Sequence, residues 1–157
     1  MQRKLTVILS ADIVGYSALM ERDETGTLTR LKESRKSLFD PRVAAQGGRI
    51  FKVMGDGVLI EFPSAASAVT CAIEIQDAME AAERHRPEDE RLRYRVGINL
   101  GDVIIDGDDI YGDGVNVAAR LQALAPEGGV ALSRNVRDQA SGPGSLPPAY
   151  PTHHLHN

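Results

Sequence analysis

The chain has 157 residues, which is enough for one domain with a hydrophobic core. Its 42% hydrophobic and 25% charged residues are typical of a soluble globular protein, and with 4% aromatic residues the core must be mainly aliphatic. The 22 acidic residues outnumber the 18 Lys and Arg residues, giving a net charge of -4. No basic patch is visible, so the sequence argues against a nucleic-acid partner.

The sequence also bears on the compartment. Cys71 is the only cysteine, which excludes an intramolecular disulfide and fits a reducing compartment. No apolar run approaches the roughly 20 residues needed to cross a bilayer, and residues 1–5 do not resemble a signal peptide. We expect a cytoplasmic chain without membrane contact, whose full-length parent has room for regulatory domains.

The first predicted element is a strand over residues 5–11, whose apolar residues point to both faces and so favour a central position. A helix follows, because residues 28, 31, 35 and 38 recur at helical spacing, with Arg35 among three leucines. Asp40-Pro41 is expected to break or kink this helix, because proline lacks the amide donor and restricts the residue before it.

A β-hairpin is predicted next. Residues 49–54 and 58–62 read as strands, and Gly55-Asp56-Gly57 between them is a strong turn signal. Ser64 is suited to cap the helix that follows, whose apolar stripe runs to Met79.

The second half repeats this alternation. A strand over residues 92–100 is predicted to end at Gly101, before a shorter strand over 103–105. A loop rich in Gly and Asp covers 106–114, and a helix covers about 117–124. A short strand at 130–132 and a last short helix complete the pattern.

This order of elements predicts the fold class. Strand, helix, hairpin, helix, hairpin, helix and strand indicate an α+β protein with a ferredoxin-like antiparallel sheet and helices packed on one face. We assign residues 1–140 to this domain. Residues 141–157 contain four prolines and no periodicity, and we expect a disordered tail that contains Pro and His.

Two acidic residues are candidate metal ligands. Asp12 ends the first strand shortly before Gly15, and Asp56 stands at the hairpin tip between two glycines. Two such carboxylates on neighbouring strands could hold two Mg²⁺ ions, and a metal pair roughly 4 Å apart can clamp a phosphoryl displacement. Taken singly, each Asp is equally well explained as a turn former.

Three further polar residues accompany this pair. Lys52 lies in an apolar strand and shares its expected face with Ile50 and Met54, so it is either an edge lysine or a donor at a pocket floor. Asn116 and Arg120 are four apart on one helix face and could address a sugar oxygen and a phosphate. An exposed polar face is the commoner explanation of such a pair.

Three segments in order carry a resemblance to a known family. Residues 11–17 (ADIVGYS), 52–57 (KVMGDG) and 109–120 (DIYGDGVNVAAR) resemble the motifs of class III adenylate and guanylate cyclase catalytic domains. The resemblance extends from about residue 5 to 138 and implies the class III nucleotide cyclase core. It implies that Asp12, Asp56 and the Ile13 carbonyl bind two divalent cations, Mg²⁺ or Mn²⁺.

The resemblance also assigns the substrate contacts. Lys52 and Asp109 would read the base; lysine only donates and ionised aspartate only accepts, which matches adenine at N1 and N6. Guanine reverses both groups and would leave buried polar atoms unpaired. Asn116 would orient the ribose, and Arg120 would stabilise charge at the α-phosphate while the 3′-oxygen attacks in line and pyrophosphate leaves.

The predicted function is therefore an adenylate cyclase, a phosphorus–oxygen lyase that makes cyclic AMP for intracellular signalling. In this family the site forms in a homodimer, with the metal aspartates from one protomer and the substrate-binding residues from the other. The family also has a final strand pair with a phosphate-contacting lysine, whereas no lysine follows Lys52 here, so we expect those C-terminal strands to be missing. A catalytically degenerate nucleotide-binding or regulatory module is the alternative, and guanylate cyclase is disfavoured by Lys52 and Asp109.

Overall fold

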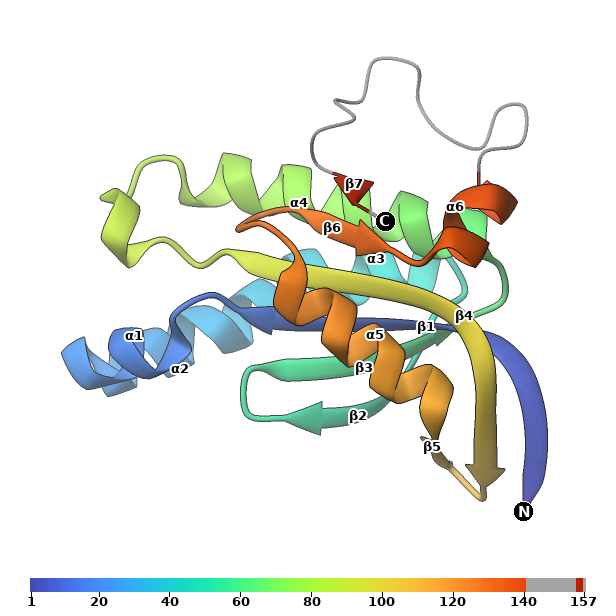
Figure 1. Cartoon of the computed structure of the whole chain (residues 1–157). Coiled ribbons are helices and arrows are strands. Elements are labelled where there is room, and N and C mark those ends of the chain that lie inside the picture. Colours follow the sequence, from blue (N-terminus) through green and yellow to red (C-terminus); the bar gives the residue numbers. More distant parts are fainter. Residues whose placement is uncertain (141–154, 157) are drawn as a thin grey trace.

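A computed structural model describes residues 1–140 and 155–156 of the chain. One mixed sheet of seven strands has the order β2-β3-β1-β4-β6-β7, and β5 pairs with β4 outside this path (Figure 1). The strands are β1 (Gln2–Ile13), β2 (Arg49–Met54), β3 (Gly57–Phe62), β4 (Tyr94–Asp106), β5 (Asp109–Tyr111), β6 (Val130–Leu132) and β7 (Leu155–His156). The α-helices are α1 (Tyr16–Arg22), α2 (Glu24–Ser34), α3 (Asp40–Ala45), α4 (Ala65–Glu83), α5 (Asp113–Leu124) and α6 (Arg134–Ala140). A π-helical turn η1 (Arg35–Phe39) and a 3₁₀ turn η2 (Glu88–Glu90) complete the elements.

The sheet confirms the predicted α+β class. Strand β1 is central and pairs antiparallel with β3 on one side and β4 on the other, while β6 runs parallel to β4. The short β7 in turn lies parallel to β6. The other residues of the predicted tail, 141–154 and 157, lie outside the described part of the chain.

Two hydrophobic cores lie on opposite faces of the sheet. The larger core joins the sheet to α1–α4, η1 and α6, and the smaller one lies beneath α5, which crosses the other face (Figure 1). The expectation that all helices share one face is therefore wrong for α5. The reason is visible in β1, whose Leu9 is buried in the larger core and whose Ile8 is buried in the smaller one, so both faces need a cover.

Helix α5 lies unusually close to β4. A side chain at Gly97 would collide with the backbone of Ala118 and Gln122, so only glycine allows this approach. The position of α5 over the sheet is therefore set by backbone contact.

The predicted break in β4 is wrong. Gly101 stays in the ladder opposite Thr6, and β4 is continuous along almost the whole of β1. The chain reverses later, at Gly107, whose φ of 63° suits the turn into β5. The segment expected to be a loop thus contains a strand, and the second hairpin is β4–β5.

The expected disruption near Pro41 takes the form of a π-helical turn, and the chain stays helical from residue 24 to 45. Helix α2 passes into η1, and α3 begins with Pro41 in its first turn, where a missing amide donor costs nothing. The π-helical turn lies just before this point and carries Arg35 at its start. Among the described helices, none is long and apolar enough to cross a membrane.

Candidate active site

The two predicted metal ligands come together at one end of the β1–β3 ladder. Ala11 pairs with Val58, so the end of β1 lies beside the β2–β3 turn that carries Asp56. The Asp56 carboxylate accepts a hydrogen bond of 2.9 Å from the backbone amide of Ile13. The Arg35 guanidinium donates to the backbone carbonyl of Asp56 at 2.9 Å, which ties η1 to the hairpin tip.

The electrostatics of Asp12 reflect this neighbour. Burial raises the pKa of Asp12 above its ordinary value, and the charge of Asp56 raises it further. A hydrogen bond from Gln122 Nε2 to Asp12 Oδ1, 2.8 Å long, and the positive charge of Arg95 lower the pKa in part. Among the described residues, no Lys, Arg or His forms an ion pair with either carboxylate.

This donor set fits a divalent cation. Two adjacent carboxylates that form no ion pair with a described residue offer the oxygen ligands that Mg²⁺ and Mn²⁺ accept. In the described part of the chain no group of three or more His, Cys, Asp or Glu side chains forms a site. Further ligands would be backbone, water or phosphate oxygens, which is usual for Mg²⁺.

Lys52 lies on a different face of β2 from the one predicted. Ile50 pairs with Ile60 but Lys52 pairs with Leu59, so the strand has a bulge at Phe51. The bulge puts Lys52 on the α5 side of the sheet, opposite to Ile50, because Leu59 belongs to the smaller core. A regular strand would have turned Lys52 toward the larger core.

Four predicted site residues meet around one hollow of about 400 Å³ on the α5 side of the sheet. Its lining includes Asp12, Asp56, Lys52 and Asn116, together with Ser10 and Gln122. Asp109 and Arg120 do not line it within this chain, and both side chains are exposed. Asp109 accepts a hydrogen bond from the amide of Ile110 at 2.9 Å.

Two residues that contact the acidic pair were not predicted from the sequence. Arg35 gave a signal in the sequence, since it occupies a position in an apolar helical stripe. In the described structure its Nε is buried without a hydrogen-bond partner. Gln122 gave none, because it is two residues from Arg120 and lies off the face that Arg120 shares with Asn116.

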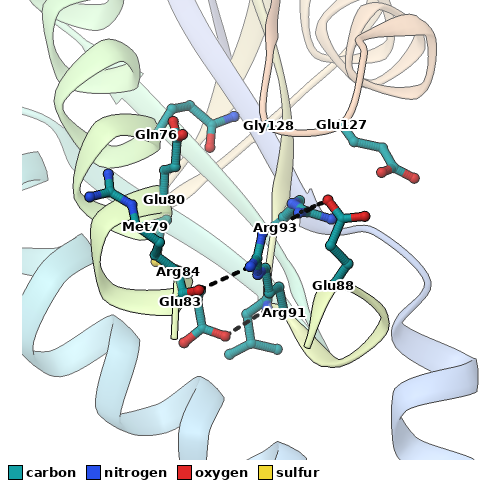
Figure 2. A pocket seen from close by; sticks show the side chains of 11 residues that line it. Gln76, Met79, Glu80, Glu83, Arg84, Glu88, Arg91, Arg93, Glu127 and Gly128 are labelled. Atoms are coloured by element: carbon teal, nitrogen blue, oxygen red, sulfur yellow. Dashed lines mark hydrogen bonds and ion pairs between the residues drawn. The ribbon is translucent and has the colours of Figure 1, made fainter. Parts of the chain in front are cut away.

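A second hollow, of about 460 Å³, lies at the C-terminal end of α4 and contains none of the motif residues (Figure 2). Its charged side chains are largely matched to one another: Glu88 pairs with Arg91 and Arg93, and Glu83 accepts from the amide of Leu92. None of the predicted site residues lines this hollow, so the predicted chemistry points to the smaller hollow beside Asp12.

Antiparallel strands thus bring two carboxylates beside a basic and an amide side chain at one hollow. Residues 2–145 match the family described as the adenylate and guanylate cyclase catalytic domain. The chain belongs to this family.

Relatives and solved structures agree with this assignment. The chain is 52% identical over 141 residues to "Putative adenylate cyclase 3" of Rhizobium meliloti, an alignment that covers 90% of this chain and 24% of the relative. It is 37% identical over 120 residues to an adenylate cyclase of Streptomyces coelicolor, covering 76% of this chain and 30% of that one. The chain thus spans about a quarter to a third of the length of these relatives.

Among solved structures, an adenylate/guanylate cyclase/hydrolase from Silicibacter pomeroyi is 48% identical, with a TM-score of 0.82 over 90% of this chain and 85% of that one. The adenylyl cyclase CyaB from P. aeruginosa is 28% identical, with a TM-score of 0.74 over 88% and 81%. These similarities confirm the class III cyclase fold predicted from the motifs.

Proposed function

We propose that the chain is an adenylate cyclase domain that converts ATP into 3′,5′-cyclic AMP and pyrophosphate in a homodimer. One observation carries the proposal: Asp12 and Asp56, far apart in the sequence, converge at one end of the β1–β3 ladder, where the Asp56 carboxylate accepts from the Ile13 amide. The names of the relatives from Rhizobium meliloti and Streptomyces coelicolor support ATP as the substrate.

Asp12, Asp56 and the Ile13 carbonyl would hold two divalent cations, Mg²⁺ or Mn²⁺, which when bound supply Lewis-acid stabilisation of the triphosphate. Lys52 donates to adenine N1 and Asp109 accepts from the N6 amino group. Asn116 hydrogen-bonds the ribose and keeps the 3′-oxygen in line with the α-phosphate. Arg120 stabilises the charge that grows on the α-phosphate as pyrophosphate departs.

The proposed dimer accounts for the two predicted substrate contacts that lie outside the hollow. Asp109 and Arg120 lie outside the hollow of their own chain and are exposed, as residues that act on a partner's substrate must be. Each protomer would give its acidic pair to one site and its substrate contacts to the other, so a two-fold axis yields two equal sites.

An assay of purified chain with Mn²⁺ and either ATP or GTP tests the activity. We expect cyclic AMP from ATP and at least about 100-fold less product from GTP, because guanine would leave Lys52 and Asp109 unpaired. Asp56→Ala should abolish turnover, and wild-type rates in that variant would contradict the metal assignment. Nucleotide binding without turnover in the unaltered chain would favour the alternative of a degenerate module.

Mixing two inactive variants tests the dimer. Asp56→Ala removes an acid and Arg120→Ala removes the phosphate contact, so each homodimer should be inactive. A mixed dimer contains one site with both lesions and one intact site, and we expect up to about a quarter of wild-type activity at equal mixing. Activity that does not return on mixing, although the variants form mixed dimers, would contradict the shared site.

A further inference from the structure

We propose that Gln122 is a positioning residue that fixes the Asp12 carboxylate for cation binding; this inference rests on the proposed function. Gln122 lies on α5, is partly buried, and lines the same hollow as Asp12. Its Nε2 donates to Asp12 Oδ1 at 2.8 Å, and its Oε1 accepts from Ser10 Oγ at 3.4 Å.

The chemistry of these three groups fixes the orientation of the amide. An ionised carboxylate only accepts, so the NH₂ end of Gln122 must face Asp12, and its carbonyl end then faces the hydroxyl of Ser10. Ser10 and Asp12 are two residues apart on β1 and so point to the same side of the sheet. The amide therefore holds one oxygen of Asp12 and leaves the other for a cation.

The backbone of Gln122 is fixed as well. Its main chain packs directly on Gly97 of β4, where no larger residue would fit. The Asp12 carboxylate therefore has a hydrogen-bond partner whose own backbone is held in place. A carboxylate held in this way keeps its geometry before the cation binds, which lowers the cost of binding.

Because Gln122 lies on α5, this helix carries residues that serve both sites of the proposed dimer. Asn116 and Arg120 lie on the same helix, and in the proposed dimer they act on the substrate of one site. Gln122 instead contacts Asp12 of its own chain, which serves the other site. One helix thus carries groups for both sites, so a shift of α5 would affect both together.

Manganese binding to the metal-free full chain, followed by the electron paramagnetic resonance signal of free Mn²⁺, tests the inference without any turnover. We expect Gln122→Leu to weaken Mn²⁺ binding about 10-fold or more, as loss of an outer-shell partner does. Gln76→Leu is the matched control, because Gln76 is a buried glutamine that donates to the carbonyls of Tyr94 and Gly129. It should lower the melting temperature and leave Mn²⁺ affinity unchanged.

Asp12→Asn separates the two proposals. Weakened binding in Asp12→Asn with wild-type affinity in Gln122→Leu would overturn the role of Gln122 and leave the proposed function standing. Wild-type affinity in Asp12→Asn would overturn the metal assignment itself. If both single variants are weakened, adding Gln122→Leu to Asp12→Asn should cause little further loss, because Gln122 acts through Asp12. Full additivity would overturn the role of Gln122.

The mixed dimer supplies a second test. The intact site of the mixture takes its acids from the Arg120→Ala chain, so Gln122→Leu on that chain should lower the recovered rate about 10-fold at limiting Mn²⁺. The same change on the Asp56→Ala chain should leave the recovered rate unaltered. Equal losses from both placements would show a general effect on α5 and overturn the inference.

Discussion

The two ends of the β1–β3 ladder carry acidic groups in opposite electrostatic environments. At one end, Glu61 of β3 accepts hydrogen bonds from Thr6 at 2.8 Å, Lys4 at 3.0 Å and Arg49 at 3.3 Å. At the other end, Asp12 and Asp56 face each other without an ion pair in the described structure. One end of the ladder thus surrounds Glu61 with hydrogen-bond donors, and the other end brings Asp12 and Asp56 close to each other.

The pKa directions follow from this difference. Burial alone would raise the pKa of Glu61, but the hydrogen bonds from Thr6, Lys4 and Arg49 hold it below its ordinary value. For Asp12, burial and the Asp56 charge raise the pKa, and the Gln122 bond only reduces the effect. The protein stabilises the charge fully at the first end and only in part at the second, which is typical of a functional site.

The largest expected effect on activity comes from placing a cation beside Asp12, so that its surroundings resemble those of Glu61. Gln122→Lys would place an ammonium group where an amide now contacts Asp12, much as Lys4 contacts Glu61. We expect cyclase activity and Mn²⁺ affinity to fall by about 100-fold or more, because the new internal cation competes with the metal. The metal-free protein should melt at the same temperature or slightly higher.

Gln122→Met is the control for that exchange, because it matches the length of the side chain without the charge. Its loss should stay near the 10-fold expected for a missing outer-shell partner. Equal losses in the Lys and Met variants would show that charge at Asp12 has no part in the effect.

The sequence predicted that Asp12 and Asp56 lie on neighbouring strands, and the pairing of β1 with β3 brings the end of β1 beside the hairpin tip. The face of Lys52 could not be predicted. A bulge at Phe51 shifts the register there, and it depends on Phe51 packing against the smaller core, which is a tertiary contact.

The errors in the fold have the same origin. Gly101 looks like a break, yet the ladder with β1 outweighs its weak local preference and β4 continues. The position of α5 on its own face follows from Gly97, whose missing side chain has meaning only once β4 and α5 are in contact. Local patterns thus predicted most of the elements, although not β5, while contacts distant in sequence determined register and face.

A smaller effect is expected from Arg35, which contacts the end of the ladder that carries Asp12 and Asp56. It holds the acidic end through the backbone carbonyl of Asp56 and forms no ion pair with the carboxylate. Arg35→Met should lower the cyclase rate about 3- to 10-fold, because the hairpin tip becomes less fixed. The loss should be smaller at saturating Mn²⁺, since the cation then helps to hold Asp56.

Arg42→Met is the control for this exchange. Arg42 donates to the carbonyl of Leu38 within the same helical segment, away from the hairpin. Rates that fall equally in both variants would indicate a loss of helix packing and would argue against a role for Arg35 at Asp56.

The smallest expected effect is on stability and concerns Glu61, at the opposite end of the ladder. Glu61→Gln keeps the size of the side chain and removes its charge, and we expect a loss of about 1 kcal/mol in unfolding free energy at pH 7. A carboxyl with a lowered pKa stabilises the fold above its ordinary value of 4.5, and the contribution disappears as the pH falls through the lowered pKa. The difference in unfolding free energy between wild type and variant should therefore be constant from pH 6 to 8 and disappear in acid.

Urea unfolding at several pH values measures this difference, and Glu33→Gln, a change at an exposed residue, is the control. A gap that persists unchanged well below pH 4.5 would mean that shape, and not charge, distinguishes this end of the ladder from the acidic one.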